Sequence, residues 1–243
     1  VNDFIKNSYS DISILSISGY SSLIFIESII INTKNLGLVN KECIVSAGFI
    51  INKLCKNIEK KTSIKYYGID SSLAPLPEDN HSIAYLIEKL GVGNYGGNGT
   101  LFLTSYLTNI IKTIVKESNI INTGFNGVMF SHLEDPIMGK RNNIKNFSID
   151  SLIAYSSVCG CGIDMVPIPG DSFEEEISSL ILDIAGLSST WNKPLGVRLL
   201  PIPLKNENEF TDFNHDFLYN TRILKINSNC IEPNFFKNKT IDY

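Results

Sequence analysis

The sequence has no apolar run long enough to cross a lipid bilayer. Its longest candidate, residues 23–31, contains Glu27 and is followed by Asn32, whereas a membrane-spanning helix needs about 20 consecutive apolar residues. No signal peptide is recognisable, and the chain begins at Val1, as expected for a fragment or a processed form. We therefore expect a protein that does not enter a membrane.

Basic character is also scarce. The chain has 21 Lys and Arg against 25 Asp and Glu, which gives a net charge of -4. The densest group of lysines, within residues 53–61, is interrupted by Glu59 and ends an amphipathic segment. Positive charge is favourable at the C-terminal end of a helix. Because nucleic-acid-binding proteins carry a basic patch, we expect no nucleic-acid partner.

The cysteines lack the number and spacing of a disulfide framework. There are five of them, at irregular intervals, whereas small secreted domains use an even number at regular spacings. This predicts a reducing, cytoplasmic environment. Cys159 and Cys161 form one Cys-X-Cys pair with no second pair nearby, so we predict no metal site at these two residues. A divalent metal at Asp70, Glu134 and Asp164 is an alternative to their acid–base role. No motif identifies a cofactor, which stays unknown.

The remaining composition is that of a folded protein. Of 243 residues, 43% are apolar and 19% are charged, which is enough for a single α/β domain over residues 1–243. Strands and helices alternate from Tyr66 to Ile202, which predicts parallel βα units. We expect helices over 40–61, 79–90, 100–115, 149–155 and 172–187, strands over 64–69, 126–133 and 195–202, and a polar loop over 140–147.

Residues 158–171 contain little side-chain bulk before an apolar strand. Gly160 and Gly162 precede this strand, which indicates that something approaches the backbone closely. Cys159 is a candidate nucleophile if its pKa is lowered. The alternative is that Cys159 is a small core residue, the commonest state of a free cysteine.

Asp164 and Arg198 are charged residues on apolar strands. An arginine in such a place needs a carboxylate, a phosphate or carbonyl groups as partner. Arg198 is therefore a candidate clamp for an anionic ligand. Asp164 is a candidate acid–base group, a ligand, or the structural partner of Arg198.

A glycine cluster, Gly96-Gly97-Asn98-Gly99-Thr100, opens the expected helix over 100–115. Free backbone N–H groups and the helix dipole at such a place can bind an anion. The alternative is a tight turn that allows close packing, because a short glycine cluster is a weak motif.

Acidic residues follow two of the expected strands. Asp70 follows the first, and Glu134 and Asp135 follow the second. Functional groups of parallel α/β folds lie at the carboxyl ends of strands. Asp135 directly precedes Pro136, so a helix cap is an equally good interpretation of that residue. Asp70 and Glu134 are candidate acid–base groups.

Five segments in this order resemble the family called domain of unknown function 711. They are GIDSSLAP (68–75), GGNGT (96–100), LED (133–135), CGCGIDMVPIPGD (159–171) and KPLGVRLLPIP (193–203). The resemblance covers residues 40–226, with 1–39 divergent or truncated and 227–243 a tail. It implies part of a large α/β barrel similar to the pyruvate formate-lyase-like fold of glycyl-radical enzymes, because members of the family are considerably longer.

Two departures limit what the resemblance implies. Asn98 stands where the family often has a histidine, and an amide cannot exchange a proton near neutral pH. The C-terminal region also lacks the radical glycine motif. The resemblance therefore implies a barrel without radical chemistry.

These observations lead to one main hypothesis and two alternatives. The main hypothesis is an enzyme or enzyme-like barrel that binds a small anionic metabolite, a carboxylate or a phosphate. The ligand would be bound by Gly96, Gly97, Gly99, Thr100 and Arg198, and the catalytic candidates are Asp70, Glu134, Asp164 and Cys159. The alternatives are a non-catalytic ligand-binding or regulatory module and an incomplete, inactive relative. An incomplete barrel leaves strand edges open, which predicts a homo-oligomer or a further segment.

Overall fold

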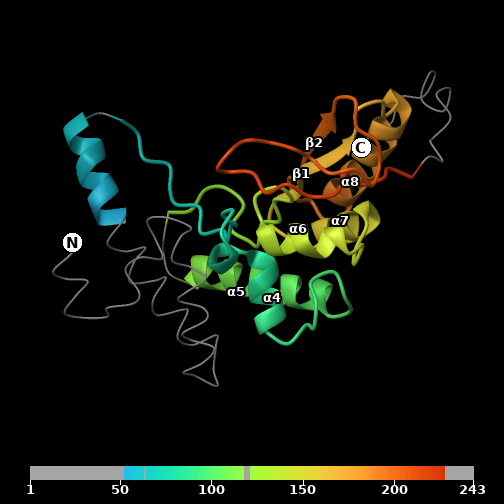
Figure 1. Ribbon diagram of the computed structural model, residues 1–243. Coiled ribbons are helices and arrows are strands. Elements are labelled where there is room, and N and C mark those ends of the chain that lie inside the picture. Colours follow the sequence, from blue (N-terminus) through green and yellow to red (C-terminus); the bar gives the residue numbers. More distant parts are fainter. Residues whose placement is uncertain (1–51, 63, 118–120, 228–243) are drawn as a thin grey trace.

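The computed structural model describes residues 52–62, 64–117 and 121–227 (Figure 1). Residues 52–62 are helical, as expected for the second half of the segment 40–61. The expectations for residues 1–51 and 228–243 lie outside the described residues. The elements that follow are η2 (Asp79–His81), α4 (Ile83–Lys89), α5 (Thr100–Glu117), α6 (Pro136–Asn143), α7 (Ile149–Ser156), β1 (Gly162–Pro169), α8 (Glu174–Thr190) and β2 (Gly196–Ile202).

A small parallel sheet organises the chain. β1 and β2 pair in parallel, with Gly162 opposite Gly196, and the register shifts between Ile163 and Val166. Single parallel bridges extend this pairing to two earlier segments: Ile69 with Asn122, Leu73 with Val128, and Ser131 with Asp164. Four consecutive segments therefore run in parallel in sequence order. The protein has mixed α/β content with a small parallel sheet.

The expected strands over 64–69 and 126–133 form isolated bridges and not regular strands. Side chains take the place of ladder partners here. The Asn126 N–H donates to the Asp70 carboxylate, and the Val128 N–H donates to the Thr108 hydroxyl. The Ser71 N–H donates in turn to the Asn126 side chain. These bonds occupy backbone N–H groups that a regular strand would use in sheet pairing.

The core lies between the sheet segments and helices α4 to α8. α4 contacts α5 and α6, α7 packs on β1, and α8 contacts both α7 and β2. At its centre Tyr95 lies edge-on to Phe130, Phe147 and Tyr155, with ring centroids 5.2–5.9 Å apart. Such edge-to-face pairs add to the stabilisation from burial alone.

Most expected helices are present, and the loop expected over 140–147 is wrong in part. The segment 79–90 divides into η2 and α4 because the Ser82 side chain accepts from the Tyr85 N–H and begins a new helix. The polar loop expected over 140–147 is in part helix, since α6 extends to Asn143. Asp135 caps α6 and Pro136 occupies its first turn, so the capping interpretation of Asp135 is confirmed.

Across the described ranges, no helix combines the length and the apolar character needed to cross a membrane.

Candidate ligand-binding site

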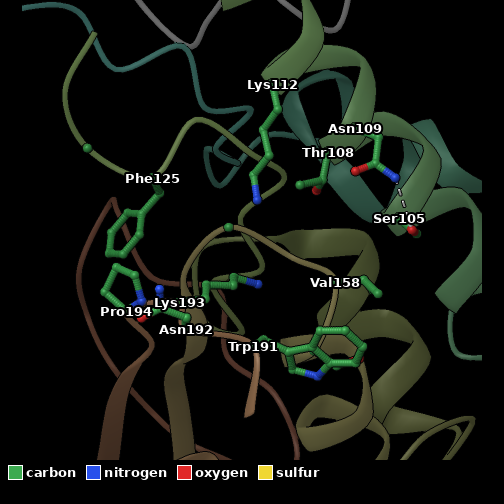
Figure 2. Close-up of a pocket in the computed structure, with 13 residues that line it drawn as sticks. Ser105, Thr108, Asn109, Lys112, Phe125, Val158, Trp191, Asn192, Lys193 and Pro194 are labelled. Carbon is green, nitrogen blue, oxygen red and sulfur yellow. Dashed lines mark hydrogen bonds between the residues drawn. The ribbon is translucent and has the colours of Figure 1, made fainter. Parts of the chain in front are cut away.

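A pocket of about 380 Å³ opens beside the middle of α5 (Figure 2). Its walls come from α5 residues between 105 and 112 and from the loops 124–125, 157–160 and 191–194. Small-molecule sites have volumes of about 300–1,000 Å³. The pocket is therefore large enough for a small metabolite.

Two lysines and no acidic residue line this pocket. Lys112 projects from α5 and Lys193 from the loop before β2, and Figure 2 shows both side chains extending into the same space. Burial lowers the pKa of Lys193, and the positive charge of Lys112 lowers it further, while the neighbouring Cys159 opposes the shift. The pocket is a site where positive charge is concentrated.

The two lysines are held differently. The Lys193 ammonium donates to the carbonyl oxygens of Ser156, at 3.0 Å, and Cys159. These carbonyls lie at and just beyond the C-terminal end of α7, where a cation is favourable. The Lys112 ammonium makes no hydrogen bond or ion pair with any residue that the structure describes. Lys193 is thus fixed in place, whereas Lys112 has no such contact within residues 52–62, 64–117 and 121–227.

The other walls are polar or aromatic. Asn109 donates to the Ser105 hydroxyl at 3.5 Å on the α5 side, as the dashed line in Figure 2 shows. Asn192 lies in the loop opposite, with a left-handed φ of 44°. Trp191 and Phe125 also line the pocket, and their side chains are 61% and 38% exposed. Amides, hydroxyls and rings therefore surround the two cations.

The pocket lies at the amino ends of the parallel segments. The loops 157–160 and 191–194 come directly before β1 and β2, and 124–125 lies between the bridges of Asn122 and Val128. The sequence predicted functional groups at the carboxyl ends. This pocket is at the opposite edge, the edge that in (β/α)8-barrel enzymes serves stability more often than catalysis.

The glycine cluster is placed at the start of α5, outside the pocket lining. Three of its N–H groups have partners within the chain: Gly96 donates to the Thr100 hydroxyl at 3.1 Å, Gly97 to the Asn94 carbonyl, and Thr100 to the Gly97 carbonyl. Thr100 is fully buried. A Cβ atom at Gly96 would lie 3.0 Å from that of Phe147, which is the close packing of the alternative interpretation. Ligand binding by Gly96, Gly97, Gly99 and Thr100 stays a prediction.

Asp70 adjoins the pocket and holds one of its loops. Its carboxylate accepts hydrogen bonds from the N–H groups of Phe125, at 3.2 Å, and Asn126, at 3.1 Å. It also accepts from the N–H and hydroxyl of Ser72. The carboxylate lies so close to Gly124 that an added Cβ there would be 2.1 Å from Oδ2. Asp70 thus holds the loop of Gly124 and Phe125 in place by hydrogen bonds to its backbone.

Asp164, Arg198 and Glu134 form a separate cluster. The Arg198 guanidinium makes a two-pronged contact with the Asp164 carboxylate, with Nη2 to Oδ2 at 2.8 Å. This contact and the charges of Asp164 and Glu134 raise the pKa of Arg198. The predicted pairing of Asp164 with Arg198 is present, and Asp70 is not part of it. None of these residues lines the pocket.

Cys159 is buried behind the pocket wall formed by Val158 and Gly160. Its sulfur accepts from the Gly162 N–H at 3.3 Å. Contact with the Cys161 thiol, the Gly162 N–H and the charge of Lys193 lower the pKa of Cys159 to about 6, against the effect of burial. The same thiol contact and burial raise the pKa of Cys161. A lowered pKa fits a nucleophile, whereas complete burial fits a core residue.

Sequence reasoning missed the two lysines and Trp191. Lys112 lies within an amphipathic helix, where a lysine is ordinary, and Trp191 and Lys193 lie between the helix expected over 172–187 and the strand expected over 195–202. One available signal was the single tryptophan of the chain beside an asparagine and a lysine. In the described residues, no group of His, Cys, Asp and Glu side chains is arranged to bind a metal ion.

Comparison with known sequences places the chain in a family. The family described as "Uncharacterised ACR (DUF711)" matches residues 16–217, which is most of the sequence. The chain belongs to this family. The DUF711 match includes the α5 wall of the pocket, its three loops, and the Asp164–Arg198 pair.

Curated relatives carry the family designation UPF0210. A UPF0210 protein of Pyrobaculum aerophilum is 29% identical over 177 residues, which is 70% of this chain and 39% of that protein. One from Desulforudis audaxviator is 33% identical over 168 residues, or 69% and 37% of the two chains. One from Thermoanaerobacter is 30% identical over 185 residues, or 76% and 40%. The chain thus matches about two-fifths of the length of these DUF711 relatives.

Proposed function

We propose that this part of the DUF711 protein binds a small anionic metabolite, a carboxylate or a phosphate, in the pocket of Lys112 and Lys193. One observation carries the proposal: two ammonium groups share a pocket of about 380 Å³ that no acidic side chain lines. Two like charges in a partly enclosed site repel each other. An anion between them replaces this repulsion with two charge-assisted contacts.

The lowered pKa of Lys193 supports this proposal. Burial and the charge of Lys112 disfavour the ammonium form, and the attraction of a bound anion would oppose both effects. Binding should therefore raise the pKa of Lys193 and be accompanied by proton uptake where Lys193 is partly deprotonated. Affinity for the anion should fall as pH rises, because the ammonium form is the one that the anion stabilises.

Calorimetric titration with inorganic phosphate and with malonate tests the proposal. We expect binding to the unmodified chain, and an affinity about tenfold lower for Lys112→Gln, the loss of one charge-assisted contact of about 1.4 kcal/mol. Lys116→Gln is the matched control, because it removes the same charge from the same helix outside the pocket. Heats that are absent for both anions, or equal losses in the two variants, would refute the proposal.

We also propose that the four parallel segments belong to a large α/β barrel of the glycyl-radical-enzyme-like type. Consecutive segments that pair in parallel, with helices between them, are the arrangement from which such barrels are built. The longer relatives would contribute the remaining strands. An experimental structure of a full-length relative tests this, and an open sheet with free edges on both sides would contradict it.

A second candidate function, catalysis, is favoured by the cluster around Arg198. Two acids from different segments, Glu134 and Asp164, act on one guanidinium, and Glu134 follows the carboxyl end of its segment. In this proposal Glu134 and Asp164 are the acid–base groups and Arg198 is oriented by Asp164. Asp70, which lies outside this cluster, and the buried Cys159 are separate catalytic candidates. Nuclear magnetic resonance of the chain incubated with small carboxylates and phosphates tests it. Turnover that is lost in Glu134→Gln supports catalysis, and anions recovered unchanged support binding alone.

A further inference from the structure

The indole of Trp191 remains exposed at the pocket although its backbone is firmly held. The Trp191 N–H donates to the Leu187 carbonyl at 3.0 Å at the end of α8, and Lys193 N–H donates to Ser188. The side chain is nevertheless 61% exposed. A large flat ring is thus presented from a fixed position beside the two lysines.

The pocket has a charged surface, formed by the two lysines, and a separate apolar surface, formed by the aromatic rings. In Figure 2 the Lys112 and Lys193 ammonium groups extend into the middle of the pocket, with the Trp191 indole below them and the Phe125 ring to one side beside Pro194. A free inorganic anion would use the lysines and leave both rings in water. A ligand that combines an anion with a flat ring would use both kinds of surface.

Charge and volume narrow the ligand class. Two lysines and no lining acid match a dianion, and a phosphate monoester carries about −1.5 to −2 charges near pH 7. A cavity of about 380 Å³ is near the lower limit for small-molecule sites, which are about 300–1,000 Å³. This volume suits one ring and one phosphate better than a dinucleotide.

We propose that the pocket binds a phosphate monoester attached to a flat ring, with the phosphate between Lys112 and Lys193 and the ring stacked on Trp191. The inference rests on the proposed anion-binding function and adds the substrate class. Aromatic faces stack on rings of many kinds with little sequence or substituent preference. Aryl phosphates and nucleoside monophosphates share this chemistry, and the probes below distinguish them.

The single tryptophan of the chain provides the reporter. Its fluorescence, excited at the red edge of indole absorption, is followed during titration with inorganic phosphate, phenyl phosphate, adenosine monophosphate and phenol. We expect phenyl phosphate to quench Trp191 and to bind at least about tenfold more tightly than inorganic phosphate, which corresponds to about 1.4 kcal/mol. Tighter binding of adenosine monophosphate than of phenyl phosphate identifies nucleotides as the source, and the reverse identifies aryl phosphates.

Variants test whether the Trp191 indole causes the preference for phenyl phosphate over inorganic phosphate. By calorimetry, Trp191→Leu should bind phenyl phosphate and inorganic phosphate equally, and Trp191→Phe should restore part of the difference. Phe217→Leu should leave the difference unchanged, because Phe217 is also 61% exposed but lies outside the pocket. Circular dichroism establishes that each variant is folded.

The outcomes separate this inference from the proposal on which it rests. Equal affinity of the unmodified chain for phosphate and phenyl phosphate, or an unchanged preference in folded Trp191→Leu, overturns the ring site and leaves anion binding intact. Tight binding of phenol alone places the ring site apart from the lysines and overturns the inference as well. Failure of every phosphate to bind overturns the inference, and failure of malonate to bind as well overturns the anion-binding proposal too.

Discussion

The Asp135 carboxylate caps α6 and is hydrogen-bonded to Ser82, the residue that caps α4. It accepts a hydrogen bond from the Ser82 hydroxyl and from the Ala84 N–H of α4 at 3.0 Å. It also accepts from the Met138 N–H of α6 at 2.9 Å. Asp135 is completely buried, so one side chain satisfies donors of two helices that would otherwise lack partners.

Replacing Asp135 with alanine should therefore destabilise the fold more than an ordinary cap deletion. Three buried donors lose their acceptor, and we expect a loss of about 2–4 kcal/mol in the free energy of unfolding. Urea denaturation measures it. Asp183→Ala, an exposed acid on α8, is the control and should change stability by less than about 0.5 kcal/mol. Equal losses in the two variants would contradict the double-capping role.

His132 should make stability depend on pH. Burial, and then the charge of Arg222, lower the pKa of His132 from 6.5 to about 3. The unfolded state therefore binds a proton that the folded state does not between these values. Stability should fall as pH falls from about 6.5 toward about 3, by about 1.4 kcal/mol per pH unit from this group. Above pH 6.5 the contribution of His132 should be constant.

His132→Gln isolates that contribution. A glutamine oxygen can replace the ring nitrogen that lies 3.0 Å from the Asn142 side-chain nitrogen, and it does not titrate. Urea titrations at several pH values should show a shallower loss between pH 6 and 4 in this variant than in the unmodified chain. His215→Gln, at an exposed position, is the control. Parallel curves for the chain and for His132→Gln would show that His132 is protonated in the fold.

The Asp164–Arg198 pair should contribute little to stability despite its two-pronged geometry. The Arg198 side chain is 56% exposed and that of Asp164 is 13% exposed, and water screens the charges of a half-exposed pair. A double-mutant cycle with Arg198→Ala and Asp164→Ala should give a coupling of about 1 kcal/mol or less. A coupling above about 2 kcal/mol would indicate that the pair is effectively buried and structural.

The sequence predicted helices well because their signals are local. The expected helix over 100–115 and the expected strand over 195–202 correspond to α5 and β2. The expected strands at 64–69 and 126–133 form only isolated bridges. In the second segment, the side chains of Asp70 and Thr108 take the N–H groups of Asn126 and Val128. Those bonds connect residues far apart in sequence, which no local pattern reveals.

The glycines before β1 were informative, and the lysines of the pocket were not. Gly160 and Gly162 were expected to allow a close approach to the backbone, and they do: a Cβ at Gly162 would lie 2.3 Å from the Gly196 carbonyl oxygen. The approaching group is the neighbouring segment and not a ligand. Lys112 and Lys193 meet only through the packing of α5 against the loop before β2, so neither residue was recognisable in its own segment.

Gly124→Ala tests whether the contact between Gly124 and Asp70 shapes the pocket. Gly124 has a φ of 74°, and an added Cβ would lie 2.1 Å from the Asp70 carboxylate that holds the loop. We expect a loss of about 1–3 kcal/mol in stability, from the left-handed backbone and the displaced carboxylate. We also expect weaker phosphate binding, because Gly124 and Phe125 line the pocket.

Gly91→Ala is the matched control for this change. Gly91 also has a positive φ, 113°, but an added Cβ there would meet no atom within 4 Å. It therefore shares the backbone strain without the contact to Asp70, and it should leave phosphate affinity unchanged in calorimetric titration. If Gly124→Ala and Gly91→Ala lose equal stability and both bind phosphate normally, Asp70 does not shape the pocket through this loop. A loss of affinity confined to Gly124→Ala would place the Asp70 carboxylate among the groups that position the site.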